Sequence, residues 1–89
     1  MLSEKIEIIN QLGLHARAAA KLVSTATRFE SKIKISKDGR EVDGKSIMSV
    51  MMLAASIGSE IEISAEGPDE SMALAAIKEL ILNRFGEEQ

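Results

Sequence analysis

Four short segments of the chain alternate apolar and polar side chains, and this period of two limits the possible folds more than any other feature of the sequence. The segments lie at residues 4–8, 32–37, 41–43 and 60–65. Because a strand places successive side chains on opposite faces, each segment predicts a strand with one apolar face. Asp38-Gly39, between the second and third segments, is a strong hairpin signal. Strands of this kind build a sheet that needs a cover on one face only.

Between these segments, apolar residues recur at helical spacing. One helix is predicted over residues 16–28 and a second over residues 47–55, with Ser46 as the N-cap of the second. A third helix is predicted to begin near Asp69, with Asp69 or Gly67 as its cap. The order β-α-β-β-α-β-α predicts a two-layer α+β fold, in which one antiparallel or mixed sheet is covered by helices on one face.

The composition narrows the class of protein. A chain of 89 residues supports one hydrophobic core, so we expect a single domain over residues 1–89. The absence of Cys excludes disulfides, and with one His we expect neither a metal site nor a cofactor. Two Phe are the only aromatic residues, which argues against RNA-binding sheets and single-strand binders. No apolar run approaches the ~20 residues of a membrane span, so we expect a soluble, cytoplasmic protein without a membrane partner.

Charge is distributed unevenly along the chain. Residues 17–45 carry eight Lys or Arg against four Asp or Glu, a net charge of +4, whereas residues 58–89 carry two against eight, a net charge of −6. A basic region on a chain whose overall charge is −3 favours an acidic protein partner over nucleic acid. Ordinary solvated faces are the alternative that the charges leave open.

The single histidine, His15, falls at the start of the first predicted helix. Free backbone N–H groups and the positive end of the helix dipole favour an anion there, and Arg17 adds a planar cation suited to phosphate oxygens. A neutral imidazole is also a competent nucleophile. No Asp or Glu lies between Glu7 and Glu30, so we expect no local carboxylate to repel a phosphoryl group or activate water against it. A helix cap or an ordinary surface histidine is the alternative.

The second predicted helix has more apolar residues than one sheet can cover. Four of them fit an arc that faces the core: Val50, Leu53, Ala54 and Ile57. Ile47, Met48 and Met51 then remain at the surface, where methionines suit a docking patch that must fit several partners. A fully buried core helix is the alternative.

Ser46 has two possible roles at the start of this helix. Its hydroxyl is predicted to cap the helix. The same position favours anions, so it would also tolerate a regulatory phosphate. The two roles are compatible, and sequence physics does not choose between them.

Two motifs, and most of the chain around them, resemble a known family. Residues 13–17, Gly-Leu-His-Ala-Arg, resemble the active-site motif of HPr, the histidine phosphocarrier of the phosphoenolpyruvate:sugar phosphotransferase system. Residues 45–51 resemble the regulatory-serine helix of that family, and residues 58–69 resemble its last strand and the start of its last helix. The resemblance implies an HPr-like open-faced β-sandwich, in which a four-stranded antiparallel sheet is covered by three helices on one face.

The resemblance also implies roles for individual residues. His15 would accept a phosphoryl group on Nδ1 from enzyme I and pass it to EIIA-type proteins, and Arg17 would steady the phosphate. Ser46 would be the target of HPr kinase/phosphorylase. The protein would be a monomeric carrier and not an enzyme. The shared docking surface would comprise Ile47, Met48, Met51, Ala20 and Lys21.

The chain departs from the family pattern at three places. Ala18 stands where the family usually has Pro, which removes a preset φ angle from the first helical turn but keeps the helix. Leu12 resembles the nitrogen-related branch called NPr, so a regulatory carrier with no role in sugar transport is the alternative function. The tail at residues 85–89 differs from members whose chain ends near the site.

Two other classes of protein compete with the carrier. The first is a small acylphosphatase-like hydrolase, whose usual phosphate cradle with an Arg and a water-orienting Asn is not seen in this sequence. The second is a ferredoxin-like interaction or nucleic-acid module, against which the acidic balance and the scarcity of aromatic residues weigh.

Overall fold

The four alternating segments form one antiparallel sheet in the computed structural model, which describes residues 1–87. The strands, in the spatial order β1-β4-β2-β3, are β1 (Leu2–Glu7), β2 (Lys32–Lys37), β3 (Arg40–Asp43) and β4 (Glu60–Glu66). The helices are α1 (Ala16–Ala26), α2 (Ile47–Met52) and α3 (Glu70–Leu82), followed by a 3₁₀ turn, η1 (Arg84–Gly86). The predicted α+β fold and the order of its elements are confirmed.

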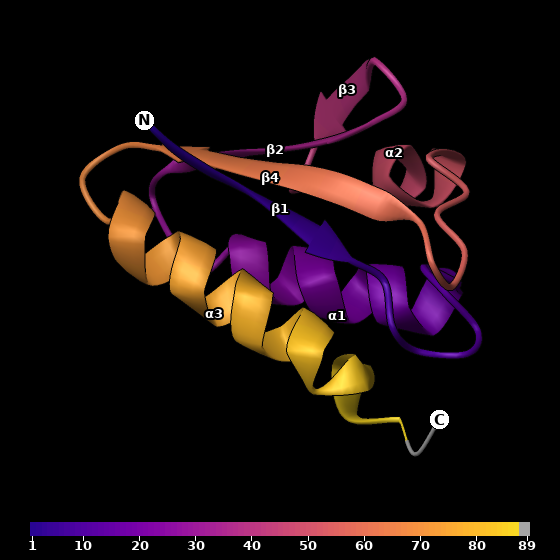
Figure 1. Cartoon of the computed structure of the whole chain (residues 1–89). Coiled ribbons are helices and arrows are strands. Elements are labelled where there is room, and N and C mark those ends of the chain that lie inside the picture. The colour runs from indigo at the N-terminus through magenta and orange to yellow at the C-terminus, as the bar shows by residue number, and fades with distance from the viewer. Residues whose placement is uncertain (88–89) are drawn as a thin grey trace.

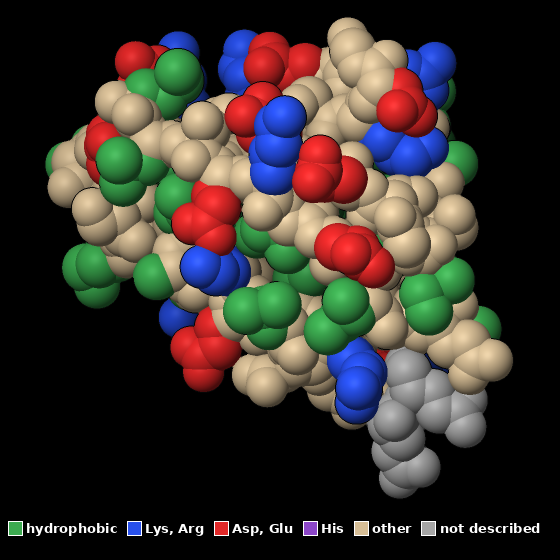
Figure 2. All heavy atoms as spheres, in the orientation of Figure 1, with side chains coloured by type: hydrophobic (Ala, Val, Ile, Leu, Met, Phe, Trp, Pro, Cys, Tyr) green, Lys and Arg blue, Asp and Glu red, His purple; other side chains and the backbone are tan. Residues whose placement is uncertain are grey.

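The register of the strands places their isoleucines on one face of the sheet. Ile61 of β4 lies opposite Ile6 of β1, and Ile63 lies opposite Ile35 of β2; all four are buried. The other face carries the alternate, polar positions. Lys5 there lies opposite Glu62, a cross-strand pair of opposite charge. Figure 2 shows acidic and basic side chains interspersed over the part of the molecule where Figure 1 shows the strands.

Helices α1 and α3 cover the apolar face of the sheet side by side (Figure 1). The helices bury small and branched side chains at helical spacing, namely Ala18, Ala19, Leu22, Val23 and Ala26 of α1 and Ala73, Leu74, Ile77 and Ile81 of α3. Ala18, in the first turn of α1, is fully buried and packs within the core. Helix α2 contacts α1 and β3 and lies near one end of the sheet.

Helix α2 is shorter than the sequence predicts. It ends at Met52 instead of residue 55, because Ala54 takes a left-handed φ of 53° that cannot continue a helix. Val50 and Leu53 are buried as predicted. The prediction is wrong for Ala54, which is exposed, and for Ile57, whose exposed fraction is 54%.

The start of α3 also differs from the prediction. Asp69 occupies the N-cap position, yet its side chain makes no capping hydrogen bond. Its carboxylate instead accepts hydrogen bonds from the backbone N–H groups of Glu30 and Ser31, each at 3.0 Å, and so ties the α1–β2 loop to α3. The Glu70 carboxylate accepts a hydrogen bond from the Gly67 N–H at 3.1 Å.

Candidate functional site

His15 is the residue that caps α1. Its backbone is extended, with φ −73° and ψ 178°, and its Nδ1 accepts a hydrogen bond from the Arg17 N–H at 3.3 Å. Its carbonyl accepts the first helical hydrogen bond, from the Ala19 N–H at 2.8 Å. His15 therefore caps α1, and this role is compatible with a nucleophilic Nδ1. An Nδ1 that accepts a hydrogen bond also carries a lone pair, which is what a nucleophile requires.

The loop before His15 is pressed against the segment that follows α2. Gly13 has φ 69°, and a Cβ atom on it would lie 2.6 Å from the Ala55 carbonyl oxygen. The next residue, Leu14, is buried and donates its N–H to the same carbonyl at 2.8 Å. Only glycine fits this close approach at a positive φ. The contact holds the start of α1 beside the end of α2.

The second ring nitrogen of His15 is engaged by a residue from the other end of the chain. Nε2 of His15 lies within hydrogen-bonding distance of Oε2 of Glu87. The expectation that no carboxylate lies near His15 is wrong, because folding returns the C-terminal tail to the start of α1. Glu87 approaches the edge of the ring that carries Nε2, whereas Nδ1 faces the first turn of the helix.

Asn10 holds the Glu87 carboxylate by a hydrogen bond. Its side-chain amide is fully buried and donates to Oε1 of Glu87 at 2.9 Å and to the Gly13 carbonyl at 2.8 Å. Its Oδ1 is buried and has no hydrogen-bond partner within residues 1–87. A buried amide with two donated bonds joins the tail to the loop that positions His15.

The path of the tail is held by packing and by unusual backbone geometry. Phe85 is fully buried, and its carbonyl accepts a 2.7 Å hydrogen bond from Lys21 Nζ. Arg84 and Phe85 both have φ 55°, and Gly86 has φ 78°. Left-handed φ at two consecutive non-glycine residues persists only where surrounding contacts enforce it. The described part of the tail therefore passes the site; residues 88 and 89 lie outside the described residues.

Glu87 is ionised at neutral pH in this setting. Partial burial raises the pKa of its carboxyl, but hydrogen bonds from Asn10 and His15, with the charges of His15 and Lys21, outweigh that effect and hold the pKa below its ordinary value. Sequence reasoning missed Glu87 as a site residue. The available signal was Phe85, an apolar residue beyond the last helix that could bring the tail back to the core.

His15 remains open to a reaction partner. Its side chain is 28% exposed, while that of Glu87 is 15% exposed. Arg17 lies in the first turn of α1, and its side chain is exposed. The arrangement offers a nucleophilic nitrogen at the first turn of α1, on the ring edge away from Glu87, where helix N–H groups favour an anion.

Comparison with known proteins decides which of the competing classes applies. The family model described as "PTS HPr component phosphorylation site" matches residues 2–83. The chain belongs to the HPr family. A phosphocarrier protein HPr of Cupriavidus necator is 58% identical over 87 residues, covering 98% of each chain. The phosphocarrier protein HPr of one Xylella fastidiosa strain is 51% identical and covers 99% of each chain.

Solved HPr structures share the fold over the whole chain. The structure of HPr-C-His from Thermoanaerobacter tengcongensis gives a TM-score of 0.96 at 48% identity and covers 100% of both chains. An HPr dimer from the same organism gives a TM-score of 0.79 at 48% identity, covering 98% of this chain and 100% of that one. The predicted HPr-like architecture is confirmed.

In this HPr family member, three of the apolar residues of α2 are at the surface, in addition to exposed Met52, while Val50 is buried. Ile47, Met48 and Met51 are exposed, with Met48 at 72%, so the alternative of a fully buried helix is wrong. Ala20 is half-buried, and Lys21 is exposed while donating to the tail.

Ser46 occupies the predicted cap of α2. Its Oγ accepts a hydrogen bond from the Ser49 N–H at 3.3 Å, and the residue is half-buried. The capping prediction is confirmed.

Within residues 1–87, no three His, Cys, Asp or Glu side chains are grouped so that they could share a metal ion. In the same range, every helix is too short or too polar to cross a membrane.

Proposed function

We propose that this HPr family member carries a phosphoryl group on Nδ1 of His15, taking it from enzyme I and passing it to EIIA-type proteins. The observation that carries the proposal is that Nδ1 faces the first turn of α1 as a hydrogen-bond acceptor. A phosphoryl group on that atom would meet backbone N–H groups and the positive end of the helix dipole.

The transfer needs no proton movement on the chain. The Nδ1 lone pair forms a bond to phosphorus as the bond from phosphorus to the donor breaks, and the electron pair of that bond stays with the donor. The Arg17 N–H, which donates to Nδ1 in the free protein, then becomes available to a phosphoryl oxygen. The exposed Arg17 guanidinium offsets charge on the oxygens. The protein acts as a covalent intermediate between two partners, a carrier and not an enzyme.

Labelling with phosphoenolpyruvate and enzyme I tests this function. The wild type should take up one acid-labile, base-stable phosphate, and His15→Ala should remain folded and take up none. Uptake by a folded His15→Ala protein equal to that of the wild type would exclude His15 as the acceptor.

The docking surface that we propose for both partners comprises Ile47, Met48 and Met51 of α2 with Ala20 and Lys21 of α1. Support comes from the exposure of the three apolar side chains and from the contact of α2 with α1. The hydrogen bond from Leu14 to Ala55 also joins the His15 loop to the segment that follows α2, which brings the proposed docking surface close to His15.

Ser46 is proposed as a regulatory phosphorylation site for HPr kinase/phosphorylase. A phosphate on a helix cap faces N–H groups and is tolerated by the helix, but it would place about −1.5 to −2 charge beside Ile47 and Met48. Desolvating that charge under a partner costs free energy, so phosphorylation should weaken docking.

The protein that receives the phosphoryl group from His15 belongs to one of two relays, one for sugar transport and one for nitrogen-related regulation. Leu12 is exposed beside the His15 loop, where a partner can contact it. We propose the sugar-transport relay, with the nitrogen-related regulatory relay as the second candidate. Comparing transfer rates to a sugar-type and a nitrogen-type EIIA protein separates the two. We also propose a monomer, and its mass in sedimentation equilibrium tests this against a dimer.

A further inference from the structure

We propose that Glu87 is a positioning residue for phosphoryl transfer, which keeps the proton of the neutral His15 ring on Nε2 and the lone pair on Nδ1, the attacking nitrogen. The proposal rests on the proposed function, since it concerns the same ring. The supporting observation is that the Glu87 carboxylate lies against Nε2 of the ring and the Arg17 N–H lies against Nδ1.

The two contacts of the ring require the same tautomer. An ionised carboxylate accepts hydrogen bonds and donates none, so Nε2 must carry the proton that points at Glu87. The Arg17 N–H donates, so Nδ1 must carry the lone pair that receives it. The opposite tautomer would face a lone pair toward the carboxylate and an N–H toward an N–H.

The carboxylate is itself held in place. Its second oxygen accepts the 2.9 Å bond from the buried Asn10 amide. The preceding turn is anchored by buried Phe85 and by the Lys21 bond to its carbonyl, across consecutive left-handed residues. A turn that is costly to form and fixed at both ends gives the carboxylate one position relative to the ring.

The charge of Glu87 matters during the reaction as well as before it. When Nδ1 bonds to phosphorus and Nε2 keeps its proton, the ring gains positive charge. The carboxylate next to Nε2 stabilises that charge where it develops. When the phosphoryl group leaves for the next acceptor, the N–P electron pair returns to Nδ1, and the ring is again neutral with its proton on Nε2.

Glu87 is not placed to hydrolyse the phosphoryl group. Both of its carboxylate oxygens have partners, Oε1 in Asn10 and Oε2 in His15. It also lies at the Nε2 edge of the ring, whereas phosphorus would be at Nδ1. A carboxylate near a phosphohistidine is therefore compatible with a carrier.

The alternative is that Glu87 only pins the tail to the domain, and two substitutions separate the roles. In Glu87→Gln, the Asn10 amide continues to donate to the side-chain oxygen, which turns the new NH2 group toward His15 Nε2. That NH2 needs a lone pair on Nε2, so the proton should move to Nδ1 and block the nucleophile. In Glu87→Ala, solvent replaces the carboxylate and neither tautomer is enforced.

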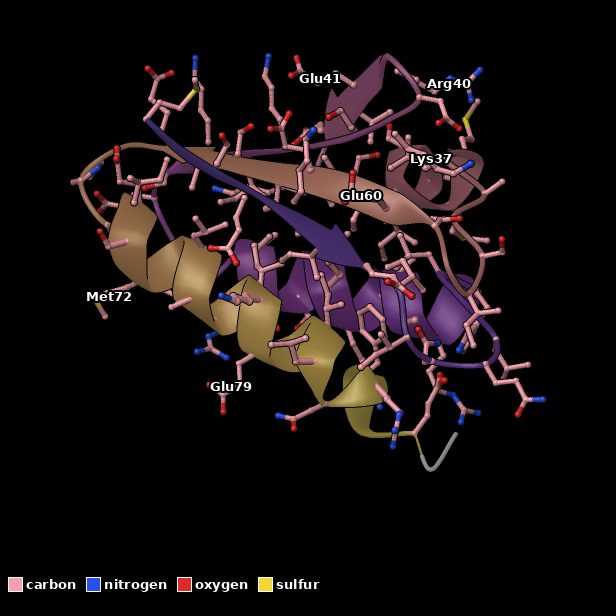
Figure 3. The ribbon with its side chains drawn as sticks, in the orientation of Figure 1. Lys37, Arg40, Glu41, Glu60, Met72 and Glu79 are labelled. Atoms are coloured by element: carbon pink, nitrogen blue, oxygen red, sulfur yellow. The ribbon has the colours of Figure 1, made fainter. Side chains whose placement is uncertain are left out.

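A matched control comes from helix α3. Glu79→Gln removes the same charge from an exposed residue that projects away from the sheet in Figure 3. It should leave both the ring and the transfer rate unchanged.

The experiment measures ¹⁵N chemical shifts of the neutral His15 ring at alkaline pH, the rate of phosphorylation by enzyme I, and the melting temperature. We expect Nε2–H in the wild type and in Glu79→Gln, a mixture in Glu87→Ala, and mainly Nδ1–H in Glu87→Gln. Phosphorylation should slow by about tenfold or more in Glu87→Gln and by less in Glu87→Ala, because an enforced wrong tautomer is worse than a free one.

Two results would overturn the positioning role: a wild-type tautomer in Glu87→Gln, or rates that follow the melting temperature with Ala as slow as Gln. Failure of the wild type to be labelled on His15 would instead reject the proposed function. The tautomer is measured on the free, unphosphorylated protein, so it tests the role of Glu87 whether or not His15 is phosphorylated by enzyme I.

Discussion

Asn10 and Glu87 are 77 positions apart in the chain, yet the Asn10 side-chain amide donates a 2.9 Å hydrogen bond to Oε1 of Glu87. The bond joins the loop after β1 to the tail after α3, and the other oxygen of the same carboxylate faces His15. The loop after β1 and the tail after α3 thus meet at the residue proposed to carry the phosphoryl group.

Asn10→Ala should both destabilise the domain and slow phosphoryl transfer. The substitution removes a fully buried amide and leaves the Gly13 carbonyl and a Glu87 oxygen without their donor. Loss of such a partner costs about 1–3 kcal/mol in the free energy of unfolding. Urea unfolding measures the loss, and the labelling rate by enzyme I measures the second effect. A variant with wild-type stability would show that the buried bonds contribute nothing.

Arg17→Ala should slow transfer without unfolding the protein. The Arg17 side chain is exposed, so its loss removes little packing, and the backbone N–H of residue 17 still donates to His15 Nδ1. Removal of one electrostatic donor to the transferring group should cost about 10- to 1000-fold in rate. The melting temperature should move by only a few degrees. A normal rate of transfer would exclude the role assigned to the guanidinium.

Met48→Ala should weaken binding to enzyme I and leave the stability nearly unchanged, because the side chain is exposed. Met72→Ala on α3 is the matched control, since Met72 is also exposed and projects away from α2 in Figure 3. Titration calorimetry measures the binding, and thermal unfolding measures the stability, which for surface positions changes by about 0.5 kcal/mol or less. Equal affinities of the two variants would remove Met48 from the docking surface.

Ser46→Asp should keep the fold and reduce the rate of phosphorylation by enzyme I. The new charge meets the N–H groups at the start of α2 but stands beside the apolar docking residues. Ser71→Asp is the control, because Ser71 is an exposed serine in the first turn of α3. If Ser46→Asp is phosphorylated as fast as Ser71→Asp, Ser46 serves only as a cap.

Asp69 should make the stability of the domain depend on pH under acidic conditions. The hydrogen bond from the Ser31 hydroxyl, followed by the bond from the Glu30 N–H, lowers the pKa of Asp69 from 3.8. A lowered pKa in the folded state stabilises the protein above the unfolded pKa, and this contribution is lost as the pH falls through the folded value.

Asp69→Asn should therefore unfold more easily than the wild type at neutral pH. Its free energy of unfolding should also fall less than that of the wild type as the pH is lowered from ~5 to ~1. Asp38→Asn, at an exposed hairpin position, is the control. Urea unfolding at several pH values measures the difference, and parallel pH profiles for wild type and Asp69→Asn would refute the assignment.

The parts of the fold that depend on local pattern could be predicted from the sequence. Alternation marked the strands because neighbouring side chains on a strand face opposite sides, and the position of His15 after Gly13 marked a helix start. The end of α2 could not be predicted, because Ala54 adopts a left-handed φ that its residue type does not favour.

The features of the site that depend on contacts between distant segments could not be predicted from the sequence. His15 and Glu87 are 72 positions apart, so no local spacing relates them. Asp69 has the residue type of a helix cap, but its carboxylate instead accepts a hydrogen bond from the N–H of Ser31, which lies in another segment. Such contacts follow from the packing of the whole domain and not from the period of any one segment.

The carrier role is tested most directly by following one phosphate on and off His15. The chain is phosphorylated with enzyme I and phosphoenolpyruvate, purified, and examined by phosphorus NMR before and after an EIIA protein is added. We predict a phosphate on Nδ1 of His15 that moves to the EIIA protein without appearing as inorganic phosphate. Phosphate on another residue, or its release to water in place of transfer, would contradict the phosphocarrier function.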